Sequence, residues 1–221
     1  KISGSVDYFV KKTTGMLLRV PVPGQTGIEE APFQNAGSMQ NKGIEVSLLF
    51  KNTVGGLSYS IGGNFSKINN KVLDLGANNG FIPGASFNNA YFVTRTEVGR
   101  PMAQFYGYKT DGLFQNWDEV NKQSVQENVA PGDVRYVVSD DKGQIGFFYL
   151  GSPLPSFTYA FNLNLGYKGF DLSATFQGVY GNKIFNGPTI YTRSSSANWN
   201  LTEDMIYRWH GEGTQTNARY P

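Results

Sequence analysis

The 221-residue sequence contains no cysteine, and its only histidine is His210. Neither disulfides nor thiolate metal sites can therefore form, and a zinc site or a histidine-based catalytic triad has almost no side chains to draw on. The formal net charge of +2 does not suggest a strongly basic face, so we expect no nucleic-acid partner. No catalytic constellation stands out, and we expect the protein not to be an enzyme.

Long hydrophobic runs are also missing, since none approaches the roughly 18 apolar residues of a membrane-spanning helix. The mean hydropathy of -0.35 resembles that of a soluble protein. A membrane β-barrel gives a similar average, because only one face of each strand is apolar. The chain does have 27 glycines and 14% aromatic residues, with only 16% charged residues. This composition favours an all-β fold.

Five runs alternate between apolar and polar residues, which is typical of β-strands with two different faces. In one of them, from Phe157 to Gly166, Phe, Tyr and Leu alternate with Thr, Ala and Asn. Helical spacing is absent from these runs, and short helices are expected only near 117–123 and near 201–209, where Thr202 could cap the helix. The five runs cover residues 2–11, 44–51, 57–66, 157–166 and 170–177.

Short and long connections alternate strictly along the chain. The stretch NTVGG (52–56) and the pair Lys168-Gly169 predict tight hairpins, whereas 12–42, 67–156 and 179 onward are long and rich in Gly, Asn, Pro and Ser. Such long loops are rare in compact soluble domains. Membrane β-barrels combine short periplasmic turns with long extracellular loops. Because both hairpins must lie on one side, residues 67–156 must contain an even number of spanning strands, and we expect zero rather than two.

These patterns predict an all-β fold that is part of a large antiparallel transmembrane β-barrel with long extracellular loops. The apolar face of each strand would meet lipid, and the face of small polar residues would line the lumen. Two alternatives stay open at this point. One is a secreted carbohydrate-binding β-sandwich, whose solvated face would commonly carry more Lys and Glu, and the other is a passive porin.

Three stretches resemble a known family. They are GRPMAQFYGYKTDGLFQ (99–115), PGDVRYVVSDDKGQIGFFYLGSPLPSFTYAFNLNLGYKGFDLSATFQGVYGNKIFN (131–186) and MIYRWHGEGT (205–214). They resemble the C-terminal barrel region of SusC/RagA-type TonB-dependent transporters, and the resemblance covers most of the chain. It implies that residues 1–221 are the C-terminal part of a TonB-dependent receptor β-barrel, with the plug domain and the final strand or strands outside this chain.

The resemblance also implies a function and partners. Members of that family import glycans or oligopeptides, too large for porins, across the outer membrane of Gram-negative bacteria. The expected partners are a SusD-like surface lipoprotein that acts as a lid, outer-membrane lipid, and the TonB-ExbB-ExbD complex, which the missing N-terminal part would contact. The sequence does not choose between a glycan and a peptide substrate.

Aromatic and charged residues in the long connections are the candidates for contacting substrate or lid. Exposed aromatic rings can stack on sugars or peptide side chains, and charged groups can add hydrogen bonds. For each residue the alternative is that it packs the loops against each other. The candidates are Phe105, Tyr106, Tyr108, Asp111, Trp117, Arg193, Trp199 and Trp209.

One turn partly resembles a calcium-binding loop. After the PGD-[IV]-R motif, family members often carry a turn rich in Asp and Asn, and here residues 138–143 read VSDDKG. Lys142 intrudes and no glutamate follows at the distance that an EF-hand requires. We therefore expect a solvated turn and no cofactor, with Asp140 and Asp141 as weak calcium candidates.

Overall fold

The computed structural model describes residues 1–19, 32–76, 80–84, 86–87, 91–139, 143–193 and 199–214. The chain divides into two compact units. The first, here called the strand unit, comprises Lys1–Ala85, Thr94–Phe105 and Gly151–Lys183. The second, here called the loop unit, comprises Ser86–Val93, Tyr106–Leu150 and Ile184–Pro221.

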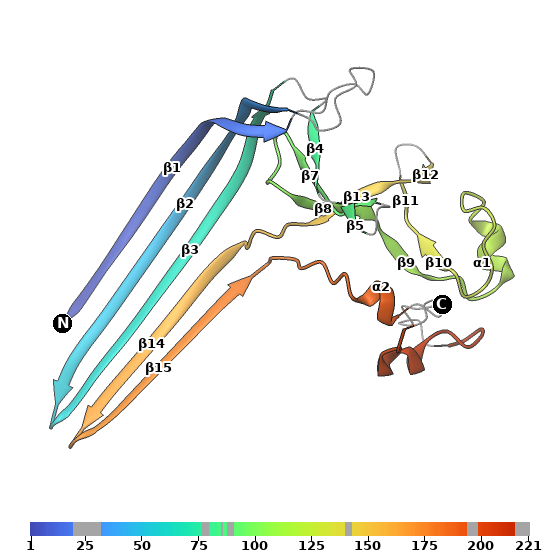
Figure 1. Ribbon diagram of the computed structural model, residues 1–221. Coiled ribbons are helices and arrows are strands. Elements are labelled where there is room, and N and C mark those ends of the chain that lie inside the picture. The colour runs from blue at the N-terminus through green and yellow to red at the C-terminus, as the bar shows by residue number, and fades with distance from the viewer. Residues whose placement is uncertain are drawn as a thin grey trace. The chain divides into compact units, whose positions relative to one another are not determined.

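The strand unit is built on one antiparallel sheet of five long strands in the order β1-β2-β3-β14-β15 (Figure 1). The strands are β1 (Ile2–Arg19), β2 (Phe33–Val54), β3 (Leu57–Leu75), β14 (Phe157–Tyr167) and β15 (Phe170–Tyr180). The sheet is open, with β1 and β15 at its edges. It confirms the expected all-β class, and each of the five predicted alternating runs lies within one of these strands.

The pairing of β3 with β14 answers the question of how many strands lie between them. The two strands are directly hydrogen-bonded in an antiparallel register from Leu57 opposite Tyr167 to Ser66 opposite Thr158. No spanning strand therefore separates them, which confirms the expectation of zero rather than two. Everything between β3 and β14 leaves and returns at the end of the sheet away from the hairpin turns.

Both predicted hairpins are present as two-residue turns. Gly55 and Gly56 connect β2 to β3 with φ angles of 58° and 85°. Lys168 and Gly169 connect β14 to β15 with φ angles of 49° and 85°. Positive φ at both central positions is the geometry that matches the right-handed twist of the strands, and glycine adopts it without steric cost.

The prediction of a long connection over residues 12–42 is mostly wrong, because most of these residues belong to β1 and β2. β1 continues to Arg19 and β2 already begins at Phe33, and the two strands pair along this extension with bulges near Gly15, whose φ is 66°. β3 likewise continues to Leu75 (Figure 1). The extensions lack a clean apolar face, so hydrophobic alternation could not reveal them. Main-chain pairing to a neighbouring strand is what makes them regular.

The apolar face of the sheet carries aromatic rings near both of its ends. Near the hairpin turns, Phe50 and Tyr59 have ring centroids 5.7 Å apart. Near the long connections, Phe157 lies between Phe65 at 5.5 Å and Tyr180 at 4.9 Å. This face is open to its surroundings, and Phe170 and Tyr8 are 81% and 71% exposed. Aromatic girdles around an exposed apolar band are typical of a wall that meets lipid.

Beyond the end of β14, the free edge of β3 is covered by a segment of the long connection. Val72 donates its N–H to the Arg100 carbonyl at 2.9 Å and accepts from the Gly99 N–H at 2.9 Å. The Met102 N–H is bound by the Asn70 side chain at 2.8 Å. These contacts satisfy main-chain groups that would otherwise be unpaired at a sheet edge, and Val72 is only 2% exposed.

Short strands form most of the remaining structure. In the strand unit, β4 (Phe81–Pro83) pairs with β7 (Thr94–Glu97), and β7 pairs with the start of β8 (Gln104–Tyr108). In the described part of the loop unit, three pairs of short strands form: β5 (Ser86–Phe87) with β6 (Tyr91–Phe92), β9 (Thr110–Leu113) with β10 (Val134–Tyr136), and β11 (Val138–Ser139) with β12 (Gln144–Ile145). The remaining strand, β13 (Phe147–Gly151), lies beside β8.

Three short helical segments lie in the part of the loop unit that the structure describes. The expected helix α1 (Trp117–Lys122) is confirmed and is capped by the Asn116 side chain, which accepts from the Glu119 N–H at 3.0 Å. The second expected helix is a 3-10 segment (Glu203–Tyr207). Thr202 precedes it but its hydroxyl bonds the Asp204 carboxylate instead of capping the backbone. A short helix α2 (Thr189–Thr192) was not expected. None of the helices that the structure describes is long and apolar enough to cross a membrane.

The two faces of β14 allow a direct test of which one meets lipid. We predict that Leu163→Arg, at the middle of the apolar face, destabilises the full-length protein in lipid vesicles by about 2–4 kcal/mol. Ala160→Arg, on the polar face of the same strand, should cost far less because its side chain enters water. Equilibrium urea unfolding measures both, and equal costs would contradict the assignment of the faces.

Candidate functional site

The polar face of the sheet forms a hydrogen-bonded wall. Asn164 donates to the Ser60 hydroxyl at 3.0 Å and accepts from the Ser173 hydroxyl at 2.7 Å, so one side chain links three adjacent strands. Thr175 likewise donates to Asn162 at 3.0 Å. These side chains are small and uncharged, and they leave shallow hollows on this face. The result is a polar surface that can border water without attracting ions of one sign.

The loop unit gathers two of the predicted aromatic residues into one cluster. Tyr106 and Tyr108 are two residues apart on β8, and the rings of both contact Phe147 of β13. The centroid of the Phe147 ring lies 5.5 Å from that of Tyr106 and 4.3 Å from that of Tyr108. Tyr149 and Tyr136 extend the cluster at 5.0 Å from Tyr106 and 5.2 Å from Tyr108. Tyr108 and Phe147 remain partly exposed. The cluster is thus both a packing element and an open aromatic surface.

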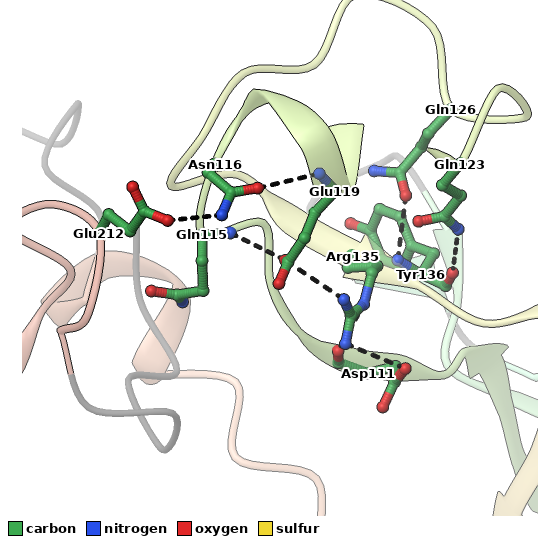
Figure 2. A network of polar contacts seen from close by, with 9 residues as sticks. All are labelled: Asp111, Gln115, Asn116, Glu119, Gln123, Gln126, Arg135, Tyr136 and Glu212. Carbon is green, nitrogen blue, oxygen red and sulfur yellow. Dashed lines mark hydrogen bonds and ion pairs between the residues drawn. The ribbon is translucent and has the colours of Figure 1, made fainter. Parts of the chain in front are cut away.

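Arg135 of the PGDVR motif holds the predicted residue Asp111 in place (Figure 2). Its guanidinium donates to the Asp111 carbonyl at 2.9 Å and pairs with the Asp111 carboxylate at 3.3 Å. A second nitrogen pairs with Glu119 of α1 at 3.4 Å. Glu119 also accepts from the Gln115 N–H at 3.0 Å. One arginine therefore joins β9, β10 and α1, while the Asp111 side chain stays 70% exposed and available for contact.

Two glutamines that follow α1 complete the free edge of β10 (Figure 2). The Gln126 side-chain amide donates to the Val134 carbonyl at 2.7 Å and accepts from the Tyr136 N–H at 3.0 Å. Gln123 donates to the Tyr136 carbonyl at 2.9 Å. The Gln126 amide thus replaces the peptide group of a neighbouring strand, which satisfies main-chain groups that would otherwise be unpaired.

The PGD turn of the loop unit (131–133) packs against the Trp209 ring and is held by a hydrogen bond of the Asp133 side chain. Gly132 has a φ of 101°, and the Trp209 ring lies so close to it that a Cβ atom would be 2.7 Å from the ring. Asp133 accepts from the Ala130 N–H at 2.8 Å, which fits a role in the turn. Next to this turn, Phe114 is fully buried. Trp209 is therefore a packing residue, and Gly132 is required because any larger residue would collide with the indole.

Some of the other predicted residues have exposed side chains, and others lie against or bond neighbouring residues of this chain. Trp117 and Trp199 are 60% and 66% exposed, although the Trp199 ring also contacts Tyr191 at 5.7 Å. Arg193 is held by Asp204 at 2.5 Å. Phe105 lies opposite Thr94, in the strand unit. Tyr108, Asp111, Trp117 and Trp199 are thus the predicted residues that offer the most surface to a ligand or partner.

Sequence reasoning missed the residues that build the site from within. Only their spatial convergence reveals the role of four polar residues of the long connection, namely Arg135, Glu119, Gln123 and Gln126. Glu212 is another, since it accepts from the Asn116 side chain at 2.6 Å (Figure 2). The weak calcium candidates at positions 140 and 141 lie outside the described residues. Among those described, no three acidic or histidine side chains come together as metal ligands.

We predict that Gln126→Ala leaves the Val134 carbonyl and the Tyr136 N–H, at the edge of β10, without their hydrogen bonds to this side chain. Losing two hydrogen bonds worth about 0.5–1.5 kcal/mol each should speed hydrogen exchange of the Tyr136 amide by about tenfold or more. Exchange measured by mass spectrometry on the full-length protein would show the change. Glu127→Ala, at the exposed neighbouring position, is the control and should leave that amide protected. Unchanged protection in Gln126→Ala would show that the glutamine is dispensable.

Comparison with known proteins relates this two-faced sheet and its loops to one family. Residues 1–201 match the family described as TonB dependent receptor-like, beta-barrel. TonB-dependent receptor P3 of Formosa agariphila is 32% identical over 98% of this chain and 22% of its own length. TonB-dependent receptor SusC of Bacteroides thetaiotaomicron is 25% identical over 84% of this chain and 18% of its own length. The chain thus spans about a fifth of the curated relatives it matches.

Solved structures agree in fold. The structure of the RagAB peptide transporter matches all of this chain and 24% of its own chain, with a TM-score of 0.77 at 21% identity. A second structure, of the RagAB peptide importer in the open-open state, matches 97% of this chain with a TM-score of 0.72. The match to a β-barrel family over residues 1–201 argues against the β-sandwich alternative. The chain belongs to the TonB-dependent receptor-like β-barrel family.

Proposed function

We propose that this chain is the C-terminal part of an outer-membrane importer of glycans or oligopeptides that works with a SusD-like lipoprotein and is driven by TonB. The observation that carries the proposal is the five-stranded wall, apolar on one face and polar on the other, in a chain that matches the receptor family over residues 1–201. A plug domain, and the segment that reaches the TonB-ExbB-ExbD complex, would lie elsewhere in the full-length protein.

In this proposal the two faces have different tasks. The apolar face seats the wall in lipid. The Asn, Ser and Thr side chains of the opposite face give a passing solute many weak hydrogen-bonding partners and no strong one, so the solute is not trapped. Asn164 already bonds both Ser60 and Ser173, which holds these side chains against the wall.

The exposed residues of the loop unit would capture the substrate or contact the lid. Rings such as Trp117 and Trp199 supply large contact areas, and the Asp111 carboxylate adds a directed acceptor. Stacking suits sugar rings and peptide side chains alike, so the substrate class stays open between glycans and oligopeptides. Because the RagAB peptide transporter has a similar fold, oligopeptides are the first substrates to test.

Energy dependence separates an importer from a passive porin. We expect cells that carry the full-length receptor and its lipoprotein to take up labelled oligopeptides or glycans, and we expect uptake to stop when TonB is deleted. A receptor that stays folded and surface-exposed in both strains is the control. Uptake that persists without TonB would contradict the importer and support the porin.

Aromatic substitutions test the role of the loop unit. We predict that Trp117→Ala together with Trp199→Ala weakens capture of substrate or lipoprotein by about tenfold or more, because exposed aromatic anchors dominate such contacts. Binding to the purified full-length receptor measures this. Phe170→Leu, on the apolar face beside a hairpin turn, is the control and should bind normally. Equal binding by the unchanged receptor, the double tryptophan variant and Phe170→Leu would show that these tryptophans do not contact substrate or lipoprotein.

A further inference from the structure

Four lysines gather on the apolar side of the sheet, where the apolar band ends. The register places Lys42 directly opposite Val10 of β1 and Asn69 of β3. Lys12 is two residues beyond Val10, and Lys67 and Lys71 flank Asn69 by two residues on either side. All three are therefore diagonal neighbours of Lys42 on the same face, about 7–8 Å from it between Cα atoms. We call Lys12, Lys42, Lys67 and Lys71 the lysine cluster.

The lysine cluster has no counter-charge among the described residues around it. All four lysines are exposed. Asp7 and Glu45 lie opposite each other on the polar face of the sheet, where Glu45 accepts from Ser66. Asp74 lies beyond a bulge in the β2–β3 pairing and accepts from the Gly76 N–H at 3.0 Å. Like charges on neighbouring strands repel, so an anion that lies among them would stabilise the arrangement.

The position of the lysine cluster matches the border of a membrane. Ten residue steps along β3 separate Leu57, next to the hairpin turn, from Lys67. That is about 34 Å along the strand, or about 25 Å of height when the strand tilts by about 40–45°. This equals the height of the apolar band of an outer-membrane barrel. The ammonium groups would therefore lie where lipid headgroups begin, with Val6, Val46 and Phe65 nearer the hairpin turns on the apolar face.

The other border of the band has no such cluster among the described residues. Near the hairpin turns, the apolar face ends in Val54 and Leu57 on β2 and β3 and in Tyr167 and Phe170 on β14 and β15. Lys168 lies in the turn itself, 5.2 Å from the Tyr167 ring. The positive charge is thus confined to the side of the long connections, which is the outer leaflet if those connections are extracellular.

We propose that the lysine cluster is a binding site for the phosphate groups of a phosphorylated glycolipid in the outer leaflet. Clustered basic side chains beside an apolar surface recognise anionic lipid headgroups, and the long lysine stems can cover apolar surface while their ammonium groups reach the phosphates. The acyl chains would lie against the apolar band below. The inference rests on the proposed outer-membrane location of the wall and is independent of what the receptor imports.

Binding to the full-length receptor in detergent tests the proposal. The probe is diphosphoryl lipid A, quantified on the protein by native mass spectrometry, beside the same lipid after enzymatic removal of its phosphates. We expect tight binding of the diphosphoryl form, a loss of about fivefold in Lys42→Gln, and a loss of about 100-fold when Lys42, Lys67 and Lys71 are all replaced by glutamine. Lys42→Arg keeps the charge and should retain binding.

Lys11→Gln is the matched control, because Lys11 adjoins Lys12 but lies on the polar face, opposite Asn41. It should bind lipid A as the unchanged protein does. Equal losses in Lys11→Gln and Lys42→Gln would overturn the proposal, as would equal binding of the dephosphorylated lipid. Competition by inorganic phosphate at the same phosphate concentration would also overturn it, since the site would then be one for free anions. Because this assay involves no transport, a failure of uptake leaves its outcome unaffected.

Discussion

The direct hydrogen bonding between β3 and β14 is the constraint on which the rest of the structure depends. Inside a membrane every main-chain N–H and C=O must find a partner in the protein, because lipid offers none. Pairing from Leu57 opposite Tyr167 to Ser66 opposite Thr158 meets that demand for two strands that are far apart in sequence. It requires the chain between them to leave β3 and to enter β14 at the same end of the sheet. The concentration of loops, aromatic clusters and charged networks in that part of the chain follows from it.

The same pairing gives the sheet its two faces. Since side chains alternate along each strand, one register places Phe65 beside Tyr159 on one face and Asn64 beside Ala160 on the other. A slip of one residue would bring polar side chains of one strand onto the apolar face and its aromatic rings onto the polar face. The observed register is stabilised on the polar face by the cross-strand hydrogen bonds of Asn164. On the apolar face it is stabilised by the stacking of Phe157 on Tyr180.

Much of this wall could be predicted from the sequence, because lipid and water impose a strict alternation over each spanning run. The turn at Lys168-Gly169 was equally clear, since few sequences tolerate positive φ at two successive residues. The strand extensions to Arg19 and Leu75 could not be predicted, because their sequences do not alternate between apolar and polar residues. The loop scaffold around Arg135 was hidden for another reason. Its partners Asp111 and Glu119 are distant in sequence and carry no periodic signal.

A disulfide across β3 and β14 tests the central claim most directly, because this chain has no cysteine of its own. Ser60→Cys and Asn164→Cys would place thiols at two positions whose side chains now share a hydrogen bond of 3.0 Å. We predict that the full-length receptor with this pair forms the disulfide in the membrane under mild oxidation, within the Cα separation of about 4.4–6.8 Å that disulfides require. If a further pair of strands lay between β3 and β14, the Cα atoms would be about 14 Å apart and no disulfide would form, which would contradict the account.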